Sequence, residues 1–227
     1  TAEVLAVVNS AFYGYKQAVT SISQAIAIIG TNSLHHLCLC LSLKDLISED
    51  QIQTDLLDQF WSDSLYRAYI AQNLARHFKV DVCESFTCGL LQDFGLLILF
   101  YLHPNQHKQW SELRAMSPTD RLFEEQQLFA ETHVTAFVEL ADYWHLPQAI
   151  IKPILVHHDI VSSVESKDNA RSLILQAADL AARILSAEDC QQASTNCHNF
   201  MQQVLHLDVT AIEECFDETA KHVKETA

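Results

Sequence analysis

The residues with most chemistry to offer lie on separate helical segments. Asp93 follows an apolar run, and His133, the doublet His157-His158 and Asp179 come further along the chain. Carboxylates and imidazoles presented by several helices are the ligands with which helical bundles build two-metal hydrolytic centres. Gln92 stands directly before Asp93, where such a centre needs a second ligand, and an amide binds transition metals poorly compared with imidazole. The pattern therefore predicts either an altered metalloenzyme or its scaffold in another role.

Each of these side chains also has a structural explanation. A polar group on an apolar helix is more often hydrogen-bonded within the core than bound to a metal. A buried carboxylate is costly unless it is paired or binds a metal. A packed, hydrogen-bonded pocket without an ion therefore stays open beside a metal site.

Other candidates are weaker. The turn with Asn9-Ser10 and Phe12-Tyr13 suits a ligand-contacting loop, although such aromatics more often fill a core. His35 and His36 are adjacent, and neighbours on a helix do not share a face. The pair Glu124-Glu125 predicts a solvated helix face. The sequence holds no Ser-His-Asp or Cys-His motif with supporting context and no glycine-rich phosphate loop.

The elements that position these residues are predicted to be helices throughout. Ser21 with Gln24 suggests a capping box, and Ser117 before Pro118 and Thr132 before His133 are further helix starts. Helices with both ends predicted cover about residues 21–29, 32–47, 54–78, 82–92, 95–102, 132–144 and 168–185. Three more are predicted to begin at about residues 104, 118 and 147. Two or three further helices follow residue 186, the last at about 208–223. No segment shows the alternation of a strand.

The fold class predicted is all-α, a single compact multi-helix bundle with no sheet. Only four Gly and four Pro occur in 227 residues, which suits long helices and short connections. We expect one domain over residues 1–185 and a C-terminal helical extension over 186–227 packed on it. Residues 1–8 begin inside a helical pattern without a cap, so further helices are expected before them.

Charge and cysteine content restrict the partners. Lys and Arg number 14 against 29 Asp and Glu, a net charge of −15. A nucleic-acid binder needs a basic stripe and an anionic membrane attracts basic segments, so neither partner is expected. The seven cysteines have no framework spacing, which indicates reduced, buried thiols in a cytoplasmic protein. No signal peptide appears, and no apolar run reaches the roughly 18 residues of a membrane span.

In three groups of residues the sequence resembles that of the HDOD family, a branch of the HD superfamily of metal-dependent phosphohydrolases. The first runs from Val8 to Gly14 and on through Ser21 to Gly30. The second contains Phe60-Trp61 and the stretch from Gly89 to Gly95. The third contains His133, the run Trp144-His145-Leu146-Pro147, and His157-His158-Asp159. The resemblance covers about residues 4–185 and implies an HD-like helical bundle.

The resemblance also implies a ligand set. Two-metal relatives carry the order His, His-Asp, His, His-His, Asp; here Asp93, His133, His157, His158 and Asp179 match. Asp63 replaces the first His and Gln92 the second, and Leu96 stands where a lysine often follows. Both lost histidines belong to the same metal in those relatives. The other ion would keep Asp93, His133, His157 and His158, so the site takes one Fe, Mn, Zn or Ni ion or none.

The function implied is that of a non-catalytic output or regulatory module in bacterial signal transduction. Its partners would be other signalling domains or proteins, and a receiver or other domain before residue 1 and a homodimer are both left open. The first alternative is a metal-dependent phosphohydrolase with an altered or mononuclear site. A weaker alternative is a module that senses a nucleotide without cleaving it.

Overall fold

The computed structural model describes residues 19–27, 31, 34, 38, 52, 54–159, 167–185 and 189–226. Its first long elements are α3 (Thr54–Phe78), α4 (Val82–Leu91), α5 (Phe94–Leu102), the 3-10 helix η2 (Pro104–Gln109) and α6 (Trp110–Ala115). They are followed by α7 (Pro118–Phe129), α8 (His133–Tyr143), α9 (Gln148–Leu155), α10 (Lys167–Arg183), α11 (Cys190–Gln203) and α12 (Val209–Thr226). No strand occurs in the described part of the chain, which confirms the all-α fold class.

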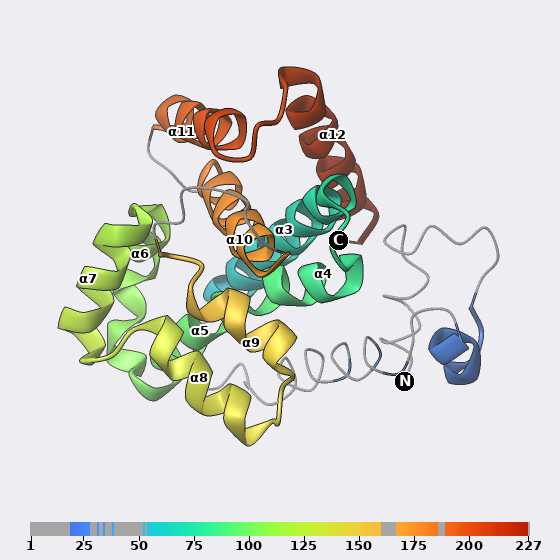
Figure 1. Cartoon of the computed structure of the whole chain (residues 1–227). Helices are drawn as coiled ribbons and strands as arrows, with labels where there is room; N and C mark the ends of the chain where they lie inside the picture. Colours follow the sequence, from blue (N-terminus) through green and yellow to red (C-terminus); the bar gives the residue numbers. More distant parts are fainter. Residues whose placement is uncertain are drawn as a thin grey trace.

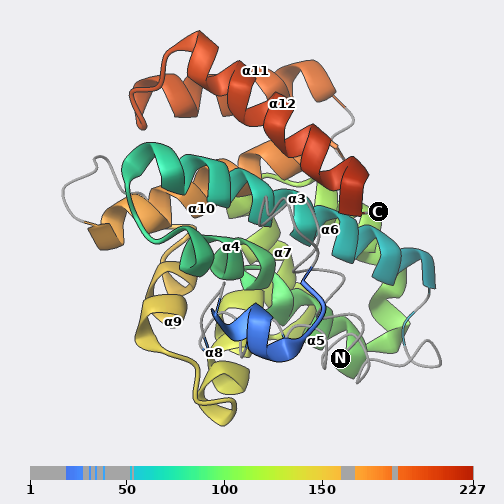
Figure 2. The same ribbon diagram turned by 90° about the vertical axis from the view of Figure 1, so that its right-hand side faces the viewer.

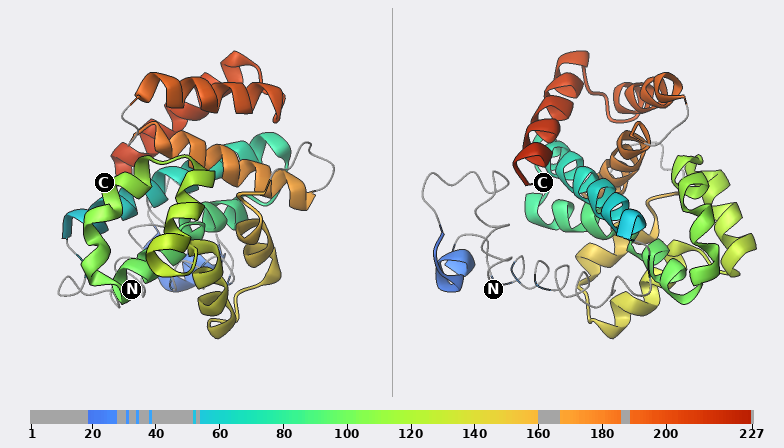
Figure 3. Two further views of the ribbon diagram at one scale, coloured as in Figure 1. Left: turned by 90° about the vertical axis from the view of Figure 1, so that its left-hand side faces the viewer. Right: turned by 180° about the vertical axis from the view of Figure 1, so that it is seen from behind.

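Helix α3 lies at the centre of the bundle and contacts α4, α10 and α12 (Figure 1). Helices α11 and α12 lie together on one side of α3 and α10, and α8 and α9 lie on the opposite side (Figure 2). The views from the other side and from behind show the same division (Figure 3). The core between these layers is rich in fully buried aromatics, among them Tyr69, Phe60, Phe94, Phe100 and Phe137.

The helix starts follow the capping signals of the sequence. The Ser117 hydroxyl accepts a hydrogen bond from the Asp120 N–H, and Thr132 forms a capping box with Thr135 at the start of α8. Ser21 accepts from the Gln24 N–H as predicted, but the Gln24 side chain accepts from Thr20 rather than from Ser21. The predicted helix over 32–47 and the turn with Asn9-Ser10 lie outside the described residues.

One glycine sets the approach of α5 to α8. A Cβ added at Gly95 would lie 1.8 Å from the carbonyl oxygen of His133 and 2.9 Å from the backbone nitrogen of Phe137. Only a residue without a side chain allows the two backbones to come this close. The contact therefore fixes the first turn of α8, which carries His133, beside the turn that carries Asp93.

The stretch Val82–Leu102 is long and apolar enough, by length and composition, to cross a membrane. This corrects the expectation that no segment of the chain reaches that length. The stretch is broken between α4 and α5 at Gln92 and Asp93, and 83% of its most apolar window is buried inside the protein. Its hydrophobicity is therefore accounted for by the core.

The two C-terminal helices pack on the central helix. The Asn73 side-chain amide on α3 donates to the Thr219 hydroxyl of α12 at 3.1 Å, and Tyr69 stacks on His222 with ring centroids 5.1 Å apart. These contacts join α12 to α3. The division of the chain at residue 185 remains a prediction.

Candidate metal centre

Asp93 sits in the turn between α4 and α5 with its side chain directed inward. It is the N-cap residue of α5, and its backbone oxygen accepts from the Leu96 N–H at 2.9 Å. Its carboxylate makes no capping hydrogen bond, although an aspartate at this position usually does. Only 3% of Asp93 is exposed, so its charge needs partners inside the protein.

Three imidazoles converge on one oxygen of this carboxylate. His133 begins α8, and His157 and His158 follow the end of α9. The Nε2 atom of His133 lies 3.1 Å from that of His158 and 3.5 Å from that of His157. Asp93 Oδ1 lies 3.6 Å from the Nε2 atoms of both His133 and His157. Within the described residues these four side chains form a group whose ligand atoms lie within 4.8 Å of one another.

The outer nitrogens of two of these rings are fixed by acceptors. His133 Nδ1 donates to the Glu125 carboxylate at 2.7 Å, and the same carboxylate accepts the His133 backbone N–H at 2.8 Å. His157 Nδ1 donates to the carbonyl oxygen of Ile154 at 2.6 Å. Because carboxylate and carbonyl oxygens only accept, both Nδ1 atoms carry their protons. The Nε2 lone pairs of neutral rings then point at one another and need a positive group between them; a metal ion would supply it, and Arg121 Nη2 already lies 3.2 Å from the Nε2 atom of His158.

The donor set fits a single metal ion. Four ligand atoms placed 2.0–2.1 Å from a tetrahedral ion lie about 3.3–3.4 Å apart. The separations of 3.1, 3.5 and 3.6 Å among these nitrogens and Asp93 Oδ1 are close to that value. Imidazole with one carboxylate suits Zn, Fe, Mn or Ni. The hydrogen bonds from His133 to Glu125 and from His157 to Ile154 are outer contacts of the kind that orient metal-binding histidines.

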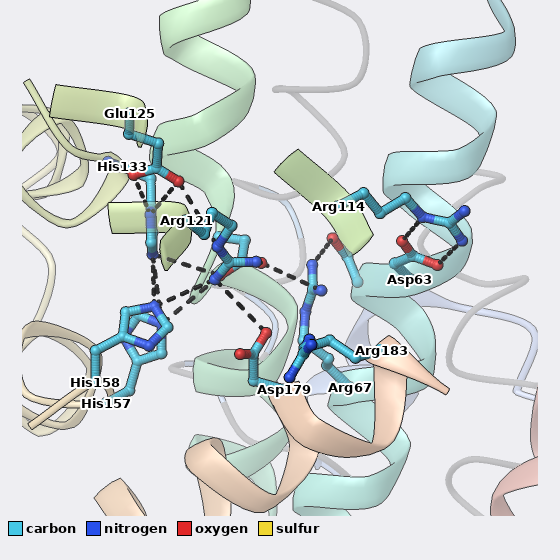
Figure 4. Close-up of polar contacts among 12 residues, drawn as sticks. Asp63, Arg67, Arg114, Arg121, Glu125, His133, His157, His158, Asp179 and Arg183 are labelled. Atoms are coloured by element: carbon cyan, nitrogen blue, oxygen red, sulfur yellow. Dashed lines mark hydrogen bonds and ion pairs between the residues drawn. The ribbon is translucent and has the colours of Figure 1, made fainter. Parts of the chain in front are cut away.

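Two buried arginines also contact Asp93, and Arg121 reaches both carboxylate oxygens, with Nη2 3.3 Å from Oδ1. Asp93 Oδ2 lies 3.0 Å from Arg121 Nη1 and 3.2 Å from Arg67 Nη1. Arg121 also reaches His158 Nε2 at 3.2 Å, Asp179 at 3.6 Å and Glu125 at 3.7 Å, so it joins both sides of the pocket (Figure 4). Its guanidinium comes from α7, and Arg67 comes from α3.

These contacts set the charge states around Asp93. Burial would raise the pKa of Asp93, but the guanidinium groups of Arg121 and Arg67 and the nearby imidazoles hold it well below its ordinary value. Burial opposes the charge of Arg121, yet Asp93, Asp179 and Glu125 together raise its pKa. Burial, reinforced by His157 and Arg121, lowers the pKa of His158, so its ring is neutral and able to act as a ligand.

Two of the remaining predicted positions, Asp63 and Asp179, line a small chamber beside the histidines. Asp63 accepts hydrogen bonds from Nε and Nη2 of Arg114, and Asp179 lies against Arg121 rather than within the four-residue group. The chamber has a volume of about 10 Å³, room for roughly one water molecule. Its charged lining consists of Asp63, Asp93, Asp179, Arg67, Arg114, Arg121 and Arg183. Gln92 is fully buried, and its side-chain amide has no hydrogen-bond partner among the described residues.

Sequence reasoning missed the partners on α7. Glu125, predicted to be on a solvated face, is 0% exposed, which makes that prediction wrong. The buried positions of α7 are Arg121, Glu125 and Phe129, spaced four residues apart. That spacing is one helix face. In the sequence, counting back from the apolar Phe129 in steps of four residues would have predicted that Glu125 and Arg121 point inward.

The structure is an all-α domain with a largely buried cluster of one carboxylate and three imidazoles. A family model of the HDOD domain matches residues 1–160, and the chain belongs to the HDOD family. A protein of uncharacterised function from Treponema pallidum (strain Nichols) is 24% identical over 188 residues. That alignment covers 82% of this chain, and the chain spans 36% of that relative's length.

Solved structures support the same fold. An HDOD domain protein from Geobacter sulfurreducens aligns with a TM-score of 0.66 and 20% identity, over 100% of this chain and 80% of its own. A "putative phosphohydrolase" from Shewanella amazonensis SB2B aligns with a TM-score of 0.68 and 19% identity, over 99% and 82%. A "putative signal transduction protein" from Marinobacter aquaeolei VT8 aligns with a TM-score of 0.66 and 20% identity, over 99% and 50%. At these identities the likeness concerns the fold.

Proposed function

We propose that this chain is a non-catalytic regulatory module of a bacterial signalling protein, and that its pocket holds one divalent metal ion. The observation that carries the proposal is the position of Arg121 and Arg67. Both guanidinium groups lie against Asp93 Oδ2, and Arg121 Nη2 also lies 3.3 Å from Oδ1 and 3.2 Å from His158 Nε2, so permanent positive charge already occupies the space beside the imidazoles. Hydrolysis by two metals needs both ions to clamp the phosphate oxygens. A pocket with room for one ion lacks that clamp.

The number of protein ligands also supports a structural or sensory ion. Asp93, His133, His157 and His158 supply four ligand atoms. Structural zinc sites are closed by four protein ligands, whereas catalytic ones keep a position open for water. With zinc bound, the four side chains would complete the coordination and hold α5, α8 and the turn after α9 together.

A mononuclear phosphohydrolase is the second candidate function. The converging imidazoles favour it, because iron or manganese accepts more than four ligands and would leave positions for water. When bound, such an ion supplies a nucleophilic hydroxide and polarises a phosphoryl oxygen. The Shewanella structure of similar fold bears a phosphohydrolase name, which agrees with this alternative.

A turnover assay separates the two. The chain, reconstituted with Mn²⁺, Fe²⁺ or Zn²⁺ in turn, is incubated with bis-p-nitrophenyl phosphate and with a cyclic dinucleotide. We expect no hydrolysis above that of an H133A/H157A variant. Metal-dependent turnover that this double variant loses would overturn the non-catalytic proposal in favour of the phosphohydrolase.

The remaining parts of the proposal concern its setting. We place the module in the cytoplasm beside other signalling domains or proteins, with pairing of two copies left open. A nucleotide sensor is less well supported, because the chamber beside the histidines holds about 10 Å³. A nucleotide that binds the folded chain would raise its thermal midpoint, and the absence of a shift across common nucleotides would exclude this role.

A further inference from the structure

The chamber beside the histidines is lined by carboxylates, as a cation site would be, but the positive charge next to them comes from arginine side chains of the protein. The carboxylates of Asp63, Asp93 and Asp179 line it, and they are 3%, 3% and 1% exposed. Several buried carboxylates around one small space are the ligands preferred by hard divalent cations. Guanidinium groups, however, share this space with them.

At Asp179 the guanidinium groups do not fully replace a bound cation. Neither of its carboxylate oxygens has a hydrogen-bond partner among the described residues. Its ion pair with Arg121 Nη2 is long, at 3.6 Å, and Figure 4 shows its carboxylate directed toward that guanidinium. Arg183 also lines the chamber and interacts electrostatically with Asp179, but the Asp179 oxygens accept no hydrogen bond from the described residues, which is costly for a buried carboxylate. The group is therefore placed as a ligand would be, but lacks a cation at close range.

Arg121 is the residue that occupies the central position. It is buried, touches Asp93 at 3.0 Å, and lies between that carboxylate and Asp179. Arg67 adds a second guanidinium at 3.2 Å from the same Asp93 oxygen. Arg114 is engaged with Asp63 at the other end of the chamber. The charge that a divalent ion would bring to Asp93 Oδ2 is thus already present on fixed side chains, and the same guanidinium of Arg121 reaches Asp179 only at 3.6 Å.

We propose that this chamber is a latent divalent-cation site, kept closed to metal by the side chain of Arg121 with support from Arg67. Shortening Arg121 opens the space between Asp93 Oδ2 and Asp179 to a hard cation such as Mn²⁺ or Mg²⁺. The inference deepens the proposed function, on which it rests, by giving the reason why the pocket takes one ion rather than two.

The test compares metal content across matched variants of the full chain. Wild type, R121M, R67M and the control R76M are titrated with Mn²⁺, and bound metal per chain is measured after desalting. Arg76 is a suitable control because its side chain is 44% exposed and lies on α3 outside the chamber. R121M is expected to bind one equivalent more than wild type, and R76M no more. Adding D179N to R121M is expected to remove the extra equivalent.

Thermal midpoints provide a second readout. R121M is expected to unfold at a lower temperature than R76M without metal, and Mn²⁺ is expected to restore part of that loss. If R121M is insoluble without metal, it is refolded with and without Mn²⁺, and recovery only with the ion supports the proposal. Equal metal content in R121M, R67M and wild type, or no restoration by Mn²⁺, overturns it.

The number of metal ions bound by wild type and the extra metal bound by R121M test different claims. Wild type without any metal contradicts the single-ion part of the proposed function, whatever the variants do. An increment of zero in R121M overturns the latent site and leaves a wild-type count of one intact.

Discussion

The carboxylate of Asp93 meets imidazoles and guanidinium groups at the same time. Oδ1 lies 3.6 Å from the Nε2 atoms of His133 and His157 and 3.3 Å from Arg121 Nη2, and Oδ2 faces Arg67 and Arg121. The two guanidinium groups are the main reason why this buried carboxylate keeps its charge. Asp93 and Arg121 therefore connect the candidate metal ligands with a network of permanent ion pairs.

Glu125 offers a residue-scale prediction. Its carboxylate accepts both the Nδ1–H and the backbone N–H of His133, and so fixes the ring whose Nε2 faces the metal position. Substitution of such an outer partner typically costs 10–100-fold in metal affinity. We expect E125Q to weaken Zn²⁺ binding by roughly that factor, measured by competition with a chelating dye. The neighbouring E124Q, on a partly exposed residue, serves as the control and is expected to match wild type.

The candidate metal ligands were predictable at this scale, and their outer partners were predictable only in part, from the four-residue spacing of Arg121 and Glu125 back from Phe129. Asp93, His133, His157 and His158 follow one another in an order that resembles a known family, and the structure brings them together. Arg67, Arg121 and Glu125 do not belong to that order, and charged residues on a helix usually face solvent. Their burial follows from tertiary partners that only the folded chain provides.

At the scale of elements, the pocket depends on the contact between α5 and α8. Gly95 lets the α5 backbone lie against the carbonyl of His133, and Thr132 caps α8 so that His133 starts at a fixed place. The starts of α7, α8 and α9 were readable from the serine, threonine and proline signals at Ser117-Pro118, Thr132 and Pro147. The close approach at Gly95 was not, because a glycine in sequence does not name the backbone it will touch.

Gly95 gives the element-scale prediction. An added Cβ would meet the His133 carbonyl oxygen at 1.8 Å, so G95A must push α5 and α8 apart. Overpacking of this kind costs about 1–3 kcal/mol and occasionally more. We expect G95A to lower the free energy of unfolding in urea by about 3 kcal/mol and to weaken metal binding, since His133 moves.

The matched control is the reverse substitution, alanine to glycine, at a position that favours glycine. Ala130 ends α7 with φ of 59°, a left-handed conformation that favours glycine. A130G is expected to be neutral or to stabilise by up to about 1 kcal/mol. G95A that proves as stable as A130G would show that the α5–α8 contact is not tight.

At the scale of the whole molecule, the buried thiols set the alkaline limit of stability. Burial raises the pKa values of Cys88, Cys197 and Cys215 to about 12, from an ordinary value near 9. Because the folded-state pKa is raised, the stabilising effect is complete below about pH 9 and is lost as pH rises toward 12. Each thiol contributes a slope of roughly 1.4 kcal/mol per pH unit in that window.

Urea unfolding at a series of pH values above 9 measures this slope. C215A is expected to give a flatter decline than wild type, because one thiol no longer ionises on unfolding. C190A is the control, since Cys190 is exposed, and is expected to keep the wild-type slope. Identical slopes in C215A and C190A would contradict the assignment.

The prediction of buried, reduced thiols holds for Cys88, Cys197 and Cys215, whereas Cys38 and Cys190 are exposed.

The overall architecture was accessible from the sequence because its information is local. Apolar periodicity, caps and the scarcity of glycine and proline led to the all-α bundle, and the absence of alternation excluded strands in the described residues. What the pattern did not contain is which helices meet. The placement of α7 beside α5 and α10, which brings Arg121 to Asp93 and Asp179, comes from long-range packing.

The most direct measurement is the number of metal ions that wild-type protein retains per chain. The protein is stripped of metal, reconstituted with excess Zn²⁺ or Mn²⁺, desalted and subjected to elemental analysis. The account requires one ion per chain, lost in H133A/H157A. Two ions per chain would mean that the guanidinium groups leave room for a second, and none would mean that the converging imidazoles serve only the packing of the core.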